Sequence, residues 1–386
     1  MALSYRRRRS GPRWGVVLSI VVVVGAAVFI VPRYLGPSAA PPPDASPALA
    51  LATATATQDT SGERVAEGDR LMSEGRWAGA ASAYAEAAKS PSVAAVAQSR
   101  WAEALVYANK PSDAIEHAQK AVDLDGRSAE FQAILALAFD WSGNADRAIT
   151  AARRATELDP RSVRGQAYLA EAYTDKYRLR EAEEALDKAA AAGGGNNPEV
   201  LRIQAYLLET KTDYAGAVTT YQRAVAIAPE RSYLYLSLGH ALRVQKQYPE
   251  AIAAFNRAVE LNPQDARAEG GLGLVYYTLE EYDSARSHLE RSIEVDPGYA
   301  SGWGQLGWVY YVQRPAAYDK AQPYFEKAIE LEKDPIRNAA YRHALGWIHV
   351  SMKRYDAARQ EFKKALELNP DLQGAKEGLE LLDKQP

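Results

Sequence analysis

The sequence predicts an all-α solenoid of about nine helical hairpins. Two observations carry this prediction: a helix-like phrase recurs along the chain, and its copies follow one another at a nearly constant interval. The phrase is clearest in AIAAFNRAVELNP (Ala251 to Pro263), where small or apolar residues fall on one helical face. Because proline cannot continue a helix, each copy is expected to end near its proline.

A second helical stretch precedes each copy of the phrase. It is clearest in WGQLGWVY (Trp303 to Tyr310), where Gly307 would let a neighbouring helix approach closely. The repeating unit is therefore helix, turn, helix, proline. The small residue taken to open each second helix recurs at intervals of 34 to 37 residues. These markers are Ala80, Ala114, Ala148, Ala182, Ala217, Ala251, Ala285, Ala321 and Ala358.

These motifs resemble the tetratricopeptide repeat, whose pattern is W-x2-L-G-x2-Y, then A-x3-F, then proline. Residues 303–310 match the first part, and Ala251, Phe255 and Pro263 match the second. The resemblance covers nine repeats over residues 61–371 and implies a right-handed superhelical solenoid. Because a lone hairpin cannot cover its apolar face, the last repeat needs a capping helix, which residues 372–386 are expected to supply.

The N-terminal segment is predicted to anchor the chain in a membrane. Residues 1–13 form a basic N-terminus, and residues 14–34 contain an uncharged Val-rich stretch long enough for one transmembrane helix, a signal anchor. A cleavable signal peptide is the alternative. The arginines favour a cytoplasmic N-terminus, which would place the repeats outside the cytoplasm as part of a single-pass membrane protein. Residues 35–60, rich in Pro, Ala and Thr, are expected to be a disordered linker.

The composition argues against several classes of function. The net charge of -3 gives no bulk attraction for nucleic acid, and the absence of cysteine excludes thiolate chemistry. The five histidines lack metal-ligand spacing, and the phosphate-binding and nucleophile-elbow motifs are missing. Since the anchor, linker, repeats and cap account for the whole sequence, no catalysis, cofactor or metal is expected.

The resemblance implies that the first helix of each repeat lines a concave groove. At the two positions expected to face inward, the last five repeats are rich in aromatic and basic residues, which dominate binding hot spots. The candidate peptide-binding residues are Tyr206, His240, Arg243, Tyr277, Trp308, Tyr311 and Trp347. The same positions in the first four repeats include Asp69, Glu103, Asp140 and Glu171, which suggests a more acidic half.

The leading hypothesis is a membrane-tethered scaffold that binds a partner protein or an extended peptide in its groove. The alternative is an accessory protein of envelope assembly or exopolysaccharide export that docks a folded protein or a glycan, since Tyr and Trp also stack on sugars. An enzyme or an RNA-binding protein is disfavoured, the latter because the groove is partly acidic. The partner and the oligomeric state are not set by these patterns.

Overall fold

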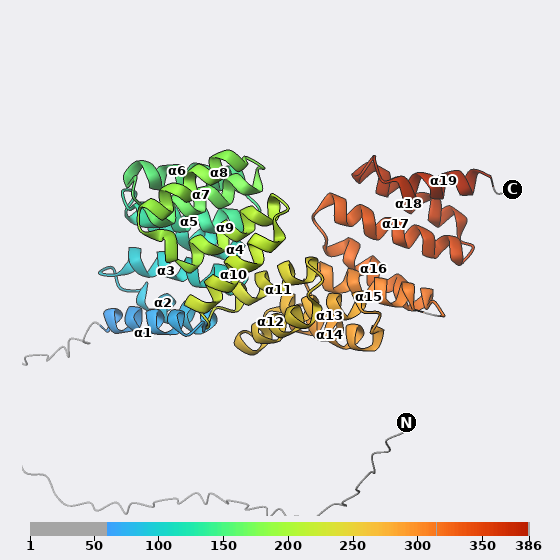
Figure 1. Cartoon of the computed structure of the whole chain (residues 1–386), viewed down its shortest axis with the longest axis horizontal. Coiled ribbons are helices and arrows are strands. Elements are labelled where there is room, and N and C mark those ends of the chain that lie inside the picture. The colour runs from blue at the N-terminus through green and yellow to red at the C-terminus, as the bar shows by residue number, and fades with distance from the viewer. Residues whose placement is uncertain (1–59, 314, 385–386) are drawn as a thin grey trace, which may run out of the picture. The chain divides into compact units, whose positions relative to one another are not determined.

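A computed structural model describes residues 60–313 and 315–384 of the chain. Within these ranges the fold is helical without strands, as the sequence predicts (Figure 1). The first helices of the hairpins are α1 (Ser61–Ser73), α3 (Ala94–Tyr107), α5 (Ala129–Trp141), α7 (Val163–Asp175), α9 (Pro198–Thr210), α11 (Ser232–Val244), α13 (Ala266–Thr278), α15 (Ala300–Val312) and α17 (Pro335–Ser351). The second helices are α2 (Trp77–Ala87), α4 (Pro111–Leu124), α6 (Ala145–Leu158), α8 (Leu179–Ala191), α10 (Tyr214–Ile227), α12 (Tyr248–Leu261), α14 (Tyr282–Val295), α16 (Tyr318–Leu331) and α18 (Tyr355–Leu368).

Each first helix packs against the second helix that follows it, and each second helix packs against the next hairpin. The last helix, α19 (Gln373–Asp383), covers α18 and α17, as a capping helix should. A short 3-10 helix, η1 (Gly194–Asn196), occupies the glycine-rich insertion before α9. The chain therefore stacks its hairpins in sequence order, so residues at equivalent repeat positions line up along one face.

The nine marker alanines sit at the centre of this stack. All nine have an exposed fraction of 0%. The structure corrects one detail of their assignment: each second helix begins about one turn before its marker, at Tyr248 for Ala251, for example. The alanines therefore lie inside the second helices, where only a small side chain fits between the paired helices.

Aromatic side chains of the second helices lock neighbouring first helices together. Phe255 of α12 has an exposed fraction of 0% and lies between α11 and α13. A Cβ atom built on Gly239 of α11 would lie 2.8 Å from its ring, and one on Gly271 of α13 would lie 2.5 Å away. Phe362 of α18 is held in the same way by Gly346 and Gly378. The glycines are thus required by the close approach of a ring.

The turns within the hairpins share one backbone conformation. Eight of them contain a residue with φ between 55° and 83°, which favours glycine. Only Gly75 and Gly143 meet this preference; the others are Asn109, Tyr177, Thr212, Lys246, Glu280 and Lys353. Six of the eight turns have no glycine at this position. The packing of the two helices therefore imposes the backbone conformation of the turn, and the local sequence does not.

The first half of the stack also contains a contact between repeats distant in sequence. Tyr233 at the start of α11 stacks on Tyr107 of α3, with ring centroids 4.8 Å apart. The rings of Trp77 and Trp141 lie 6.2 Å from the same tyrosine ring. These four side chains belong to α2, α3, α5 and α11, so the sixth repeat packs against the first three.

The predicted N-terminus 1–13, transmembrane helix 14–34 and linker 35–60 lie outside the described residues, except for Thr60. Among the helices of residues 60–313 and 315–384, none combines the length and the hydropathy needed to cross a bilayer. The membrane anchor and its orientation therefore stay predictions.

Gly271→Ala is expected to destabilise the repeats, because its Cβ would lie 2.5 Å from the buried Phe255 ring. In an unobstructed helix the same change stabilises a protein by about 1 kcal/mol, whereas overpacking costs about 1–3 kcal/mol. Thermal unfolding should show a lower Tm for Gly271→Ala. Gly195→Ala is the control, since nothing lies within 4 Å of its added Cβ. An unchanged or raised Tm for Gly271→Ala would contradict this account of the packing.

Candidate functional site

The aromatic candidates of the later repeats pack on the phenylalanines of the second helices. His240, Trp308 and Trp347 meet Phe255, Phe325 and Phe362 edge to face, at centroid distances of 5.0, 5.1 and 5.5 Å. All three candidates are half-buried. Each ring is therefore held by its own repeat, and part of it stays accessible on the first-helix surface.

Tyr277, Trp308 and Tyr311 are in one apolar cluster, which we call the aromatic surface. Trp308 lies 5.5 Å from Tyr311 in an edge-on arrangement, and Tyr311 lies 5.7 Å from Tyr318 of α16. Tyr277 lies 6.1 Å from Tyr282 of α14. All three members are half-buried. These contacts fix the orientations of the three rings.

The other candidates lie apart from the aromatic surface. Trp347 belongs to a separate cluster at the C-terminal end and donates its indole N–H to His343 at 2.9 Å. Arg243 is half-buried, its Nε has no hydrogen-bond partner, and burial lowers the pKa of its guanidinium. Tyr206 and His240 line a pocket farther toward the N-terminus. The predicted set therefore divides into three regions, namely the aromatic surface, the C-terminal cluster with Trp347 and the pocket with Tyr206 and His240, and does not form one continuous stripe.

That pocket, here called the inner pocket, has a volume of about 350 Å³. Its walls come from α5, α7, α9, α10, α11 and α13. They combine aromatic rings with acidic and basic groups. The main lining residues are Asp140, Trp141, Glu171, Asp175, Arg202, Tyr206, Glu209, Tyr221, Tyr233, His240 and Arg267.

A buried ion triad forms one wall of the inner pocket. Arg202 contacts Glu199 at 2.6 Å and Glu171 at 2.7 Å, and all three side chains are less than 10% exposed. Burial disfavours the charged form of Arg202, but the two carboxylates raise its pKa well above the usual value. Tyr233 donates its hydroxyl to Glu199 at 2.8 Å. The triad thus connects α7, α9 and α11, and its charges are compensated.

The carboxylates of the early repeats are mostly paired in the same manner. Asp69 contacts Arg100, and Glu103 contacts Arg164 at 3.0 Å. The more acidic half suggested by the sequence is therefore not a row of free carboxylates. Asp140 is the exception, because it is 6% exposed and its Oδ1 has no hydrogen-bond partner. Burial, together with nearby Glu171 and Asp175, raises the pKa of Asp140 well above its ordinary value.

Glu209 is a second carboxyl of the inner pocket without a cationic partner. It accepts a hydrogen bond from the hydroxyl of Tyr221 at 3.1 Å. Burial nevertheless raises the pKa of Glu209 to about 7. Burial and the neighbours Arg243 and Arg267 lower the pKa of His240 to about 4, so this histidine is neutral at physiological pH. The pocket therefore contains one carboxyl, Glu209, that titrates near neutrality and a histidine that does not.

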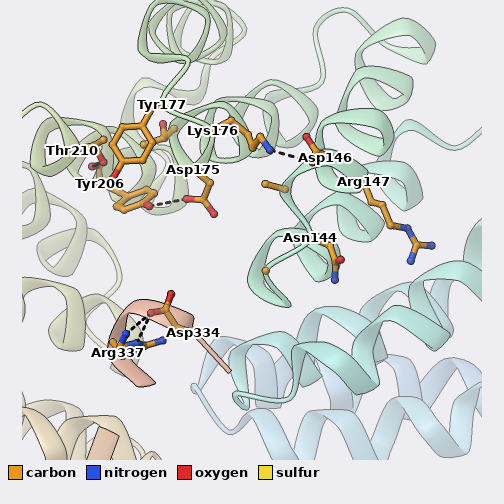
Figure 2. Close-up of a pocket in the computed structure, with 13 residues that line it drawn as sticks. Asn144, Asp146, Arg147, Asp175, Lys176, Tyr177, Tyr206, Thr210, Asp334 and Arg337 are labelled. Carbon is orange, nitrogen blue, oxygen red and sulfur yellow. Dashed lines mark hydrogen bonds and ion pairs between the residues drawn. The ribbon is translucent and has the colours of Figure 1, made fainter. Parts of the chain in front are cut away.

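A larger polar pocket of about 760 Å³ lies beside the turns of the hairpins (Figure 2). Tyr206 donates its hydroxyl to Asp175 at 2.7 Å, and Lys176 pairs with Asp146 at 3.1 Å. Three acidic and three basic side chains line it: Asp146, Asp175, Asp334, Arg147, Lys176 and Arg337. Because these charges balance, the polar pocket does not select a ligand of either sign.

Sequence reasoning missed the residues near the start of each first helix. Glu130, Arg164, Glu199, Tyr233 and Arg267 follow one another at intervals of 34 or 35 residues. Several of them contact one another across repeats: Arg164 contacts Glu130 at 2.7 Å, and Tyr233 contacts the buried Glu199 at 2.8 Å. The signal was visible as alternating charge at the repeat period.

Metal coordination finds no support in the geometry. Across the described ranges, no group of three or more His, Asp or Glu side chains could hold a metal ion.

Family models described as tetratricopeptide repeats match residues 99–162, 141–198, 169–232, 203–266, 236–300 and 339–372. The chain belongs to the tetratricopeptide-repeat family. This result confirms the resemblance drawn from the motifs over more than half of the sequence. Comparison with curated proteins finds no match.

Solved structures show the same fold. The crystal structure of the APC/C hetero-tetramer Cut9–Hcn1 aligns with a TM-score of 0.64 at 15% identity, covering 78% of this chain. This tetratricopeptide-repeat chain spans only 58% of the length of that one. The human IFIT1 dimer with PPP-AAAA aligns with a TM-score of 0.53 at 18% identity, covering 71% of this chain and 73% of that one. At these identities the likeness concerns the fold alone.

Glu209→Gln is expected to stabilise the free protein at pH 8 and to change it little at pH 5. The folded-state pKa of about 7 exceeds the ordinary value of 4.5, so the ionised carboxylate is a cost to folding. The cost is absent well below pH 4.5, where Glu209 is protonated in the folded and the unfolded protein. It grows as the pH rises from 4.5 to about 7 and is complete above that pH. Gln keeps the shape without the charge.

The measurement is the Tm difference between Glu209→Gln and wild type at the two pH values. Glu294→Gln on α14 is the control, because Glu294 is 66% exposed and pairs with Arg291. A Tm difference that is the same at both pH values would show that Glu209 does not titrate as described.

Proposed function

We propose that this protein is a membrane-tethered scaffold that binds an extended segment of a partner protein on its first-helix surface, without catalysis. The observation that carries the proposal is the aromatic surface, in which Tyr277, Trp308 and Tyr311 are oriented by their own repeats and remain half-exposed. Tetratricopeptide scaffolds are suited to protein and peptide binding because their stacked helices offer a long, regular surface.

The rigidity of these rings favours binding. Trp308 is supported by Phe325 on one side and Tyr311 on another, so little rotamer freedom would be lost on contact with a partner. Tyrosine and tryptophan are enriched among binding hot spots, whose truncation costs about 2 kcal/mol or more. Neighbouring helices lie about 8–10 Å apart, which corresponds to roughly three residues of an extended chain. A partner would therefore place an anchor about every third residue.

The proposed tether rests on the N-terminal sequence. Residues 14–34 would form the membrane anchor, with residues 1–13 in the cytoplasm and the repeats on the opposite side. If residues 35–60 behave as a flexible chain, their mean end-to-end distance is roughly 30 Å. The repeats would then search a shell of that depth above the bilayer for a membrane-associated or exported partner.

The triple variant Tyr277→Ala/Trp308→Ala/Tyr311→Ala is expected to lose its partner in affinity capture from gently solubilised membranes. Removing three anchors should reduce binding at least tenfold, since one hot spot alone contributes about 2 kcal/mol. Tyr355→Ala is the matched control, because this 40%-exposed tyrosine lies on a second helix. A thermal melt establishes that each variant is folded. Unchanged capture by the folded triple variant would overturn the proposal and favour a folded protein or glycan docked on another face.

The proposed orientation predicts the behaviour of a reporter fused to the C-terminus. An alkaline phosphatase fusion, which folds only outside the cytoplasm, should be active, and a fluorescent protein that needs the cytoplasm should not. Replacing Arg6, Arg7, Arg8 and Arg9 by Glu is expected to weaken this orientation by removing the positive charges. Cytoplasmic fluorescence from the unmodified chain would exclude the orientation.

A further inference from the structure

The inner pocket has the size and the surroundings of a ligand site. Its volume of about 350 Å³ lies within the range typical of small-molecule and side-chain pockets. The rings of Trp141, Tyr206, Tyr221 and Tyr233 are in its wall. Arg202 already lies over the ring of Trp141, with its guanidinium carbon 5.2 Å from the ring centroid. The pocket therefore combines acidic groups with aromatic rings that tolerate a cation.

The cations of the pocket are already compensated. Arg202 is shared by Glu171 and Glu199, and the former also lines the cavity. Arg267 forms two hydrogen bonds, at 2.8 and 2.7 Å, with Asp265, which does not line the cavity. His240 is neutral, and Arg243 beside it does not line the cavity. Arg202 also acts electrostatically on Asp140 and Asp175, but its hydrogen bonds go to Glu171 and Glu199.

Three carboxyls lack a cationic partner inside or beside the cavity. Asp175 lies at the exposed rim and accepts the hydroxyl of Tyr206. Glu209 is half-buried and accepts the hydroxyl of Tyr221. Asp140 is 94% buried, and its Oδ1 is unpartnered. A buried polar atom without a hydrogen-bond partner costs about 1–3 kcal/mol. The unpartnered Oδ1 of Asp140 therefore lowers the stability of the protein while the pocket is empty.

We propose that the inner pocket binds an organic cation, namely an ammonium or guanidinium group. On the proposed function, which this inference refines, the group is a Lys or Arg side chain of the partner; a free amine of similar size presents the same chemistry. The cation would pass Asp175 at the rim and reach Glu209 and Asp140. Within the described ranges no acidic group has the geometry of a metal site, which favours an organic cation over a metal ion.

Binding should be coupled to proton release. Burial raises the pKa of Glu209 to about 7, so this carboxyl is partly protonated near neutral pH when the pocket is empty; burial also raises the pKa of Asp140 well above its ordinary value. Tyr221 contacts Glu209 directly, and the other charged or titratable groups that line the pocket are Asp140, Glu171, Asp175, Arg202, Tyr206, Tyr233, His240 and Arg267. A cation among them favours the ionised carboxylates, and the protons leave for solvent. Affinity should therefore fall as the pH decreases from 8 to 6.

The test uses the full chain and three probes at pH 7.5. The probes are the peptide acetyl-Gly-Ser-Arg-Ser-Gly-amide, the same peptide with neutral citrulline in place of arginine, and agmatine. Isothermal titration in two buffers of different ionisation enthalpy measures both the affinity and the protons released. The arginine peptide should bind at least tenfold more tightly than the citrulline peptide, with release of protons.

Asp140→Asn and Glu209→Gln should each weaken the arginine peptide at least tenfold while leaving the free protein as stable as wild type or more so. Glu294→Gln, which removes an exposed carboxylate on α14, should bind like wild type. Binding of agmatine without the peptide would support the free amine as the source of the cation. Equal binding of the arginine and citrulline peptides, unaltered binding by both pocket variants, or displacement of the arginine peptide by inorganic phosphate would overturn the inference.

The two proposals can fail separately. Loss of the partner in the aromatic triple variant, with full capture by Asp140→Asn and Glu209→Gln, would leave the scaffold function standing and reject the pocket. If the pocket binds the arginine peptide but the triple variant loses no partner, the pocket proposal stands and the aromatic surface is rejected as the binding site.

Discussion

The contact on which the stack depends is a phenylalanine ring inserted between two glycines. Phe255 fills the space left by Gly239 and Gly271, which belong to consecutive first helices. This one side chain therefore closes its own hairpin and sets the distance to the next. Phe362 repeats the arrangement with Gly346 and Gly378. Because the ring needs the missing side chains on both sides, the repeat motif prescribes packing between units as well as within them. The half-exposed aromatic residues Trp308 and Trp347 are supported by the same kind of ring, so the core sets their orientations.

The two halves of the stack use their first-helix surfaces differently. In the later repeats, aromatic side chains such as Trp308 remain accessible. In the fourth to sixth repeats, Glu171, Glu199, Arg202 and Tyr233 form buried ion pairs and hydrogen bonds that compensate most of the charge there. A buried ion triad is costly to desolvate and is weak evidence for stability by itself. Here the hydrogen bonds of Arg202 go to Glu171 and Glu199, and the Oδ1 of Asp140 is left without a partner. This unpartnered buried carboxyl distinguishes the inner pocket from a structural network in which every charged group is paired.

The repeat fold could be predicted from the sequence because its signals are local and periodic. Alanine and proline positions, read at intervals of about 34 residues, identified every hairpin, and only the starts of the second helices needed correction. The placement of Trp308 and Tyr311 on one first-helix surface was implied by the family resemblance, and their packing in one cluster agrees with it. Tyr233 could not be assigned, since its contacts with Tyr107 and Trp77 join segments more than a hundred residues apart. The pairing of Glu171 with Arg202 also depends on how consecutive hairpins rotate, which no local pattern records.

The Tyr233 contact has a consequence for how this chain unfolds. In a simple solenoid each unit touches only its neighbours, so unfolding can proceed unit by unit from either end. A ring from the sixth hairpin that stacks on α3 and approaches α2 and α5 adds contacts of long sequence separation. The first six hairpins are thereby joined into one cooperative block, whereas the helices after α12 pack mainly on their neighbours in sequence, apart from Asp334 and Arg337, which line the polar pocket. Pulling on the C-terminus would therefore release the last hairpins one after another, and the first six would resist until they open together.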